Sequence, residues 1–170
     1  VDLKINAGEF DAGWPGAAMA LSPEGNALVY VAGDGRSKNL FLRRLNQADV
    51  KPLPDTTGAT APFFSPDGQW VAFFAERKLK KVAVSGGTAL TLCDAPNPRG
   101  GTWLADGTII FATNSAWSGL QRVSAAGGEP TVLTKPNRER GEFDHLWPEF
   151  LPGGDAVLFT ITSTSASIDN

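Results

Sequence analysis

Ser65-Pro66-Asp67-Gly68-Gln69-Trp70-Val71-Ala72-Phe73 joins a tight-turn signal to a run of aromatic and β-branched residues. Serine, proline, aspartate and glycine favour turns, and the run that follows them is typical of a buried strand. Related turns occur at 22–25, 104–107 and 151–154, and the final glycines of the four turns are spaced 43, 39 and 47 residues apart. A period near forty residues, with strand-like runs around each turn, is typical of a β-propeller.

Four strand-like runs accompany each turn. An innermost run precedes it, a second run follows it, a third alternates apolar with basic or polar residues, and a fourth closes the unit. The innermost runs are 18–21, 61–64, 101–103 and 147–150; the second runs are 28–31, 70–74, 109–111 and 157–159; the third runs are 40–45, 79–84 and 120–123; the fourth runs are 50–53, 89–92 and 131–134. The sequence therefore predicts an all-β fold, a partial β-propeller of about three and a half four-stranded antiparallel blades.

The domain organisation follows from this map. We expect an N-terminal arm or strand at 1–17, blades over 18–162 and a polar tail at 163–170. Three and a half blades cannot close a ring, so either the chain is part of a longer propeller or copies complete one another. Leu3-Lys4-Ile5 is a candidate strand of the last blade, and Trp14 is a candidate packing anchor for the arm. The predicted blades are 18–60, 61–99, 100–145 and a partial blade at 146–162.

Aromatic residues recur at one place in the second runs. They are Tyr30, Phe73, Phe111 and Phe159, and near-continuous apolar runs of this kind indicate strands that are covered on both faces. We therefore expect these four side chains to pack between blades. The lysines and arginines of the outer runs are expected to discourage edge pairing rather than to form a functional basic patch.

Composition excludes several classes of function. The formal charge of −3 offers no footprint for nucleic acid or for an anionic membrane. The longest apolar stretches, of about six residues, are far shorter than a bilayer requires, so no membrane insertion of this segment is expected. Cys93 is the one cysteine and cannot form an internal disulfide, and we expect it to be a small buried apolar residue.

No catalytic or metal-binding constellation stands out in the sequence. His145 lies near Glu142 and Asp144, but no second histidine or cysteine stands at metal-ligand spacing, and a hydrogen-bonded loop histidine is the expected role. Ser118 is not part of a Gly-X-Ser-X-Gly elbow. Asp67 is explained by its turn. The sequence therefore predicts no catalytic residue, no metal, no cofactor and no enzyme activity.

Binding residues are expected on one face of the propeller. The loops that join the fourth strand of one blade to the first strand of the next line the channel mouth, and the loops between second and third strands share that face. These loops carry Asp34, Arg36, Glu76, Arg77, Asp94, Asn97, Arg99, Asn114, Trp117, Arg138, Arg140, Asp144 and His145. Arginine and tryptophan dominate binding hot spots, so Arg99 and Trp117 lead the ligand-binding candidates, together with Arg138, Asp144 and His145.

The repeat resembles the WD40-like, TolB-type β-propeller repeat, in which a Ser-Pro-Asp-Gly turn precedes a strand such as Ile-Ala-Phe. The resemblance covers about 18–162, and 65–73 is the best copy. Glu24, Ala105 and Gly153 depart from the turn pattern, but each turn still ends in glycine. A narrower resemblance is to propellers in the extracytoplasmic part of bacterial serine/threonine kinases, although no kinase signature is present. It is carried by 79–82, 85–87, 92–95 and 99–101.

The resemblance implies a non-catalytic binding or sensory module for a protein or peptide ligand, because members of this family serve as protein-binding platforms and ligand sensors. An alternative is the accessory propeller of an enzyme, either an α/β-hydrolase or peptidase or a receptor-like serine/threonine kinase. A third possibility is an assembly unit that self-associates through open blade edges. The family also implies a periplasmic or other extracytoplasmic location.

Overall fold

The structure, a computed structural model, describes residues 18–33, 37–47, 49–115, 118–151 and 156–163. Two compact units divide the chain, Val1–Thr91 and Leu92–Asn170, with the boundary inside β8. The strands are β1 (Met19–Leu21), β2 (Ala27–Ala32), β3 (Asn39–Arg44), β4 (Val50–Pro52), β5 (Thr60–Phe64), β6 (Trp70–Ala75), β7 (Lys78–Ala83), β8 (Leu90–Asp94), β9 (Pro98–Trp103), β10 (Thr108–Ser115), β11 (Ser118–Ser124), β12 (Thr131–Val132), β13 (Glu142–Phe150) and β14 (Val157–Ser163). Leu3-Lys4-Ile5, Trp14, Asp34, Arg36, Trp117, Gly153 and the tail 164–170 lie outside the described residues.

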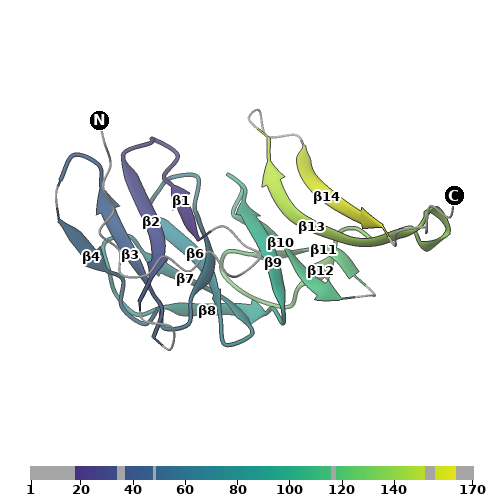
Figure 1. Cartoon of the computed structure of the whole chain (residues 1–170), viewed down its shortest axis with the longest axis horizontal. Coiled ribbons are helices and arrows are strands. Elements are labelled where there is room, and N and C mark those ends of the chain that lie inside the picture. Colours follow the sequence, from purple (N-terminus) through teal and green to yellow (C-terminus); the bar gives the residue numbers. More distant parts are fainter. Residues whose placement is uncertain (1–17, 34–36, 48, 116–117, 152–155, 164–170) are drawn as a thin grey trace, which may run out of the picture. The chain divides into compact units, whose positions relative to one another are not determined.

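The strands form four sheets in the order of the chain (Figure 1). Three sheets have four strands each, β1–β4, β5–β8 and β9–β12, and β13 pairs with β14 in a two-stranded sheet. Strand pairs with a determined register are antiparallel, as β2 with β3 and β10 with β11. The predicted all-β fold of about three and a half blades is confirmed.

The repeated turn has the same hydrogen bonds in different copies. In the second copy Gly68 N–H donates to the Ser65 carbonyl (2.9 Å), and Ser65 Oγ accepts the N–H of Trp70 (2.9 Å). Gly68 has φ +66°, a conformation that costs glycine little. In the first copy Ser22 Oγ accepts the N–H of Ala27 in the same way (2.9 Å). The turn therefore survives the glutamate in the first copy, as predicted.

One backbone bond aligns the four repeats. The first residue of each turn donates its N–H to a carbonyl at the start of the second strand or just before it: Ser22 to Ala27, Ser65 to Trp70, Leu104 to Thr108 and Leu151 to Ala156. The third residue after each acceptor is then Tyr30, Phe73, Phe111 or Phe159, as the aromatic spacing predicts.

The predicted packing between blades is seen within each unit. In the first unit Phe73 is fully buried in a cluster with Val29 and Leu42 of the neighbouring sheet. In the second unit half-buried Phe159 packs against a cluster that contains Ile110 and Leu120 of the β9–β12 sheet. Each pair of sheets is therefore held face to face by the aromatic position of the repeat.

The innermost strands β9 and β13 begin earlier than predicted. The sequence predicts starts at Gly101 and Trp147, whereas the strands begin at Pro98 and Glu142. These extensions contain polar residues, so the hydrophobic pattern of the sequence does not predict them. The long partner strands nevertheless pair with them, as in the pairs Thr113↔Pro98 and Asp144↔Thr162. The predicted blade borders after residues 99 and 145 consequently fall inside strands.

Candidate functional site

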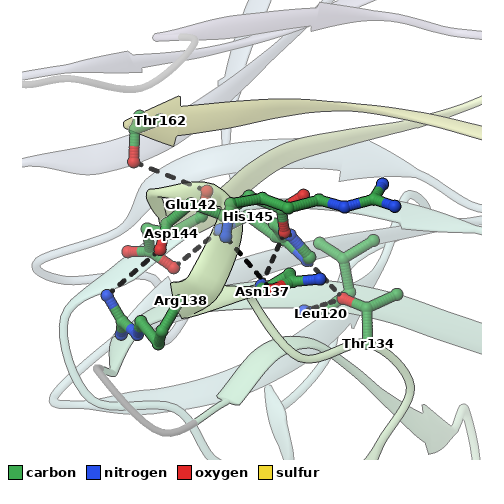
Figure 2. Close-up of polar contacts among 9 residues, drawn as sticks. Leu120, Thr134, Asn137, Arg138, Glu142, Asp144, His145 and Thr162 are labelled. Atoms are coloured by element: carbon green, nitrogen blue, oxygen red, sulfur yellow. Dashed lines mark hydrogen bonds and ion pairs between the residues drawn. The ribbon is translucent and has the colours of Figure 1, made fainter. Parts of the chain in front are cut away.

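The predicted site residues lie on strands and a short helix of the second unit. Arg99 is in β9, and Asp144 and His145 are in β13, so the prediction that these three occupy loops is wrong. Arg138 lies in η1 (Arg138–Arg140), a 3-10 turn just before β13. Figure 2 shows Arg138 beside the β13 segment that carries Asp144 and His145. Trp117 is outside the described residues.

The turn that presents Arg138 is capped at both ends. Asn137 precedes it, and its Oδ1 accepts the N–H of Arg140 (3.3 Å). Gly141 follows with φ +75°, and its N–H donates to the Arg138 carbonyl (3.1 Å). An asparagine before and a glycine after a turn are the residues that such ends favour. Local sequence therefore fixes the turn immediately before β13.

A chain of hydrogen bonds surrounds His145. The N–H of Leu120 donates to Thr134 Oγ1 (2.9 Å), which lies 2.7 Å from His145 Nδ1. On the other side of the ring, His145 Nε2 lies 3.1 Å from Glu142 Oε2. The same Glu142 oxygen accepts the N–H of Asn137 (2.7 Å). Every polar atom of the imidazole therefore has a partner within the protein, as Figure 2 shows.

Charge assigns the protons in this chain. The Asn137 N–H first, and then the His145 ring, lower the pKa of Glu142 below its ordinary value. An ionised carboxylate only accepts hydrogen bonds, so His145 Nε2 carries a proton. In the neutral ring Nδ1 then accepts the hydroxyl proton of Thr134. Leu120 N–H, Thr134, His145 and Glu142 consequently form one polarised series from β11 to β13.

Gly119 makes room for His145. A Cβ atom at this position would lie 2.5 Å from His145 Nδ1 and 2.6 Å from Thr134 Oγ1, closer than real contacts. The glycine is needed here for space, since its φ is not positive. His145, which is 4% exposed, thereby packs directly on β11, and its ring centroid lies 4.8 Å from that of Phe159.

Asp144 is a buried carboxylate with cations around it. The residue is 5% exposed, and its Oδ1 accepts the N–H of His145 (2.8 Å). Burial raises the pKa of Asp144, and this effect is opposed by the His145 N–H and then by the charges of Arg99 and Arg138. The effect of burial on the pKa of Asp144 is larger than the opposing effect of these partners. The fold therefore keeps an acidic group where its ionised form is costly.

The two arginines near Asp144 are held by other groups. Arg99 Nη1 donates to the carbonyl of Pro98 (3.0 Å), and its side chain is half-buried. Arg138 Nη1 donates to the Glu142 carbonyl (3.3 Å), and its guanidinium carbon lies 5.2 Å from the centroid of the Phe143 ring. The charges of both guanidinium groups also favour the ionised form of Asp144.

Sequence reasoning missed Trp147. Its ring lies on Gly100, the neighbour of Arg99, where an added Cβ atom would be 2.8 Å from Trp147 Cε3. Trp147 has φ +54°, unusual for a bulky residue, and it lies within the β-bulge between Leu146 and Glu149. The available signal was the glycine pair after Arg99, because a glycine in a strand often marks a close approach.

The arrangement offers binding groups more readily than reactive ones. Thr134, His145 and Glu142 have the residue types of a catalytic triad, but the Thr134 hydroxyl also accepts the Leu120 N–H and the ring is buried. Among the described residues, no group of three or more His, Cys, Asp or Glu side chains is placed to hold a metal ion. The side chains best placed to contact a ligand are exposed Arg138 and half-buried Arg99 and Trp147, and Asp144 lies buried beside them.

The fold resembles known propellers, whereas the sequence alone finds no match. No protein-family model and no curated protein matches the sequence. A protein assigned as TolB from Agrobacterium tumefaciens has a TM-score of 0.74 and 16% identity, over 96% of this chain and 60% of that one. TolB from Acinetobacter baumannii has a TM-score of 0.63 and 21% identity, over 86% of this chain and 40% of that one.

Enzymes that contain this kind of structure are also similar. The acylaminoacyl peptidase of Pyrococcus horikoshii has a TM-score of 0.58 and 15% identity, over 83% of this chain and 27% of that one. No helix in the described part of the chain is long and apolar enough to cross a membrane. This chain spans about three fifths or less of the length of these three solved proteins. Its fold is that of part of a TolB-like β-propeller, as the repeat predicts, and the narrower resemblance to kinase propellers stays a prediction.

Proposed function

We propose that this chain is a non-catalytic β-propeller module that binds a protein or peptide ligand through Arg99, Arg138, Asp144 and Trp147. The observation that carries the proposal is the burial of Asp144, which keeps a carboxylate in strand β13 at an energetic cost. Strained backbone and costly buried charge concentrate at functional sites. Trp147 supplies a second such feature on the same strand.

The chemistry of these groups suits a peptide. A carboxylate accepts hydrogen bonds from peptide N–H groups or from a cationic side chain, and guanidinium groups donate to peptide carbonyls. A half-buried indole supplies apolar contact area beside them. His145 acts as a positioning residue, because its bonds to Thr134 and Glu142 fix the backbone from which Asp144 projects.

Selection from a random peptide library tests this proposal. Peptides selected on the intact chain should bind the Arg99→Ala variant about tenfold or more weakly, as expected when a charged hydrogen-bonding group is lost. Arg44→Ala is the matched control, because Arg44 is an exposed arginine of β3 in the first unit and is not among the residues of the expected binding face. Equal binding to all three proteins would place the ligand site elsewhere.

An accessory role beside an enzyme domain is a second candidate. It is favoured by the likeness to acylaminoacyl peptidase and to the isopeptidase AtxE2, with TM-scores of 0.58 and 0.53. The two candidates differ in what the reading frame encodes around this segment. A hydrolase elbow or a kinase domain in the same frame favours the accessory role, and a propeller alone favours the binding module. An extracytoplasmic location is part of the main proposal, on family resemblance.

A further inference from the structure

The connection between β12 and β13 gathers positive charge. Its segment 135–141 contains three exposed cations and one exposed carboxylate, Glu139, in a chain whose formal charge is −3. The cations are Lys135, Arg138 and Arg140. A basic segment on a protein with an excess of acidic residues attracts ligands of negative charge. The sign of the charge at this segment is therefore opposite to that of the chain as a whole.

The carboxylates that follow this segment offset little of its charge at the surface. Glu142 Oε2 accepts the N–H of Asn137 (2.7 Å) and lies 3.1 Å from His145 Nε2, so this oxygen already serves two internal donors. Asp144 is 5% exposed. The charge that the segment presents to a ligand is therefore mainly positive.

A second guanidinium group approaches from β9. The charges of Arg99 and Arg138 both favour the ionised form of Asp144, so both groups lie near the same buried carboxyl. Arg99 belongs to β9 and Arg138 to η1, and both of these elements contact β13. Two cations beside one buried carboxyl leave an excess of positive charge. A ligand carboxylate at this place would be attracted by both arginines.

Arg138 is held in a geometry that suits a carboxylate. Its Nη1 donates to the Glu142 carbonyl (3.3 Å), and its guanidinium carbon lies 5.2 Å from the centroid of the Phe143 ring. A side chain that is ordered before binding loses less conformational entropy when the ligand binds. The guanidinium is a flat fork of five N–H donors, and this fork matches the two oxygens of a carboxylate in addition to an internal contact.

We propose that this site selects ligands that carry a carboxylate, with Arg138 as the main contact and Arg99 as the second. The carboxylate comes either from an aspartate or glutamate side chain or from the C-terminus of a peptide, since both present the same two oxygens. Phe143 is a positioning residue, because it acts through the guanidinium that lies on its ring. The inference rests on the proposed function, since it names the chemical class of the peptide that the same site binds.

Two random peptide libraries distinguish the sources of the carboxylate. One has free C-termini, the other is amidated, and both are selected on the intact chain. If a side chain is the ligand, peptides from the amidated library should share an Asp or Glu, and its replacement by Asn or Gln should weaken binding about tenfold or more. If the terminal carboxylate is the ligand, binders should come from the free library, and amidation should weaken them to the same extent.

Variants of the chain locate the contact. Arg138→Gln should weaken binding of a selected peptide about tenfold or more, and Arg138→Lys should restore only part of it, because lysine keeps the charge but lacks the flat fork. Arg122→Gln is the matched control, since Arg122 is an exposed arginine of β11 in the same unit, and it should bind like the parent chain. Phe143→Leu should weaken the carboxylate peptide but not its amide counterpart, a difference that a purely structural role would not produce.

The outcomes separate this inference from the proposed function. The inference is overturned if selected peptides bind Arg99→Ala more weakly but tolerate replacement of their carboxylates, and the proposed function then stands. Peptides that bind Arg99→Ala as well as the intact chain would contradict the proposed function, and the inference with it. An effect of Arg122→Gln as large as that of Arg138→Gln would overturn the inference as well, because overall charge would then explain the attraction.

Discussion

Two contacts between neighbouring sheets differ in kind. In the first unit, the sheets β1–β4 and β5–β8 meet through an apolar cluster that includes Val29, Leu40, Val71 and Phe73. In the second unit, the contact between β9–β12 and β13–β14 combines a smaller apolar cluster around Ile110 with the hydrogen-bonded series of Thr134, His145 and Glu142. The same repeat therefore builds one contact from apolar side chains and the other partly from titratable ones.

The difference between the two contacts distinguishes residues that stabilise the fold from residues that we propose to serve a ligand. Apolar burial is sufficient to pack two blades, as the first contact demonstrates, whereas polar groups must each be satisfied when they are buried. Natural proteins depart from purely apolar packing mainly where function requires polar groups. The polar contact adjoins Asp144 and the two arginines, which supports the proposal of a binding site there.

The largest expected effect concerns the apolar contact. Phe73→Ala should lower the free energy of unfolding by about 3–5 kcal/mol, because the ring is fully buried between two sheets. Urea unfolding followed by tryptophan fluorescence measures it. Phe63→Ala is the control, since Phe63 is half-buried on β5, and its cost should be clearly smaller. Equal losses of unfolding free energy in the two variants would show that the cluster around Phe73 does not stabilise the contact between the two sheets.

Gly119→Ala should be the most damaging small change in the polar contact. The added methyl group overlaps His145 and Thr134, and overpacking of this kind costs about 1–3 kcal/mol. The double variant with His145→Ala should lose part of that penalty, because one of the two overlapping side chains is gone. A double-mutant cycle of unfolding free energies measures the coupling. Additive losses would mean that Gly119 matters for another reason.

Thr134→Val should cost about 1–3 kcal/mol, less than the loss of Phe73. Valine keeps the shape but leaves the Leu120 N–H and His145 Nδ1 without their hydroxyl partner. Thr131→Val is the control, because Thr131 is an exposed threonine of β12 whose hydroxyl is bonded only to exposed Arg122. Thermal and urea unfolding of both variants measure the difference. Equal unfolding free energies for the two variants would mean that the Thr134 hydroxyl contributes nothing to stability.

Sequence predicted the fold well because its signals are local. Each turn satisfies its own hydrogen bonds, and each aromatic lies at a fixed distance from its turn, so Ser65 and Phe73 are readable without tertiary information. The arrangement of the candidate site residues was predicted only in part, and their role in binding stays a prediction. Arg138, Asp144 and His145 do come together, but their placement in loops was wrong for Asp144 and His145, because pairing with β14 extends β13 through polar residues. Trp147 was missed, since its position depends on the close approach of β9.

Acid should weaken the polar contact through Glu142. Its pKa is lowered in the folded protein, so the stability it contributes is complete above the pKa of the unfolded chain and is lost as pH falls through the folded value. Glu142→Gln should remove this part of the acid dependence of the unfolding midpoint. The effect is small, because the carboxylate is partly exposed. Identical pH profiles for the two proteins would mean that the carboxylate is not tied to Asn137 and His145.

The pH dependence of unfolding for Asp144→Asn tests the central claim most directly. Asparagine keeps an oxygen to accept the His145 N–H but has no charge to bury. Because burial raises the pKa of Asp144, its contribution to stability is present below the unfolded pKa and is lost as pH rises through the folded value. We expect Asp144→Asn to be at least as stable as the parent chain near neutral pH, with the gap closing in acid. A variant that is less stable at neutral pH would show that Asp144 serves the fold, and the proposed binding site would lose its main support.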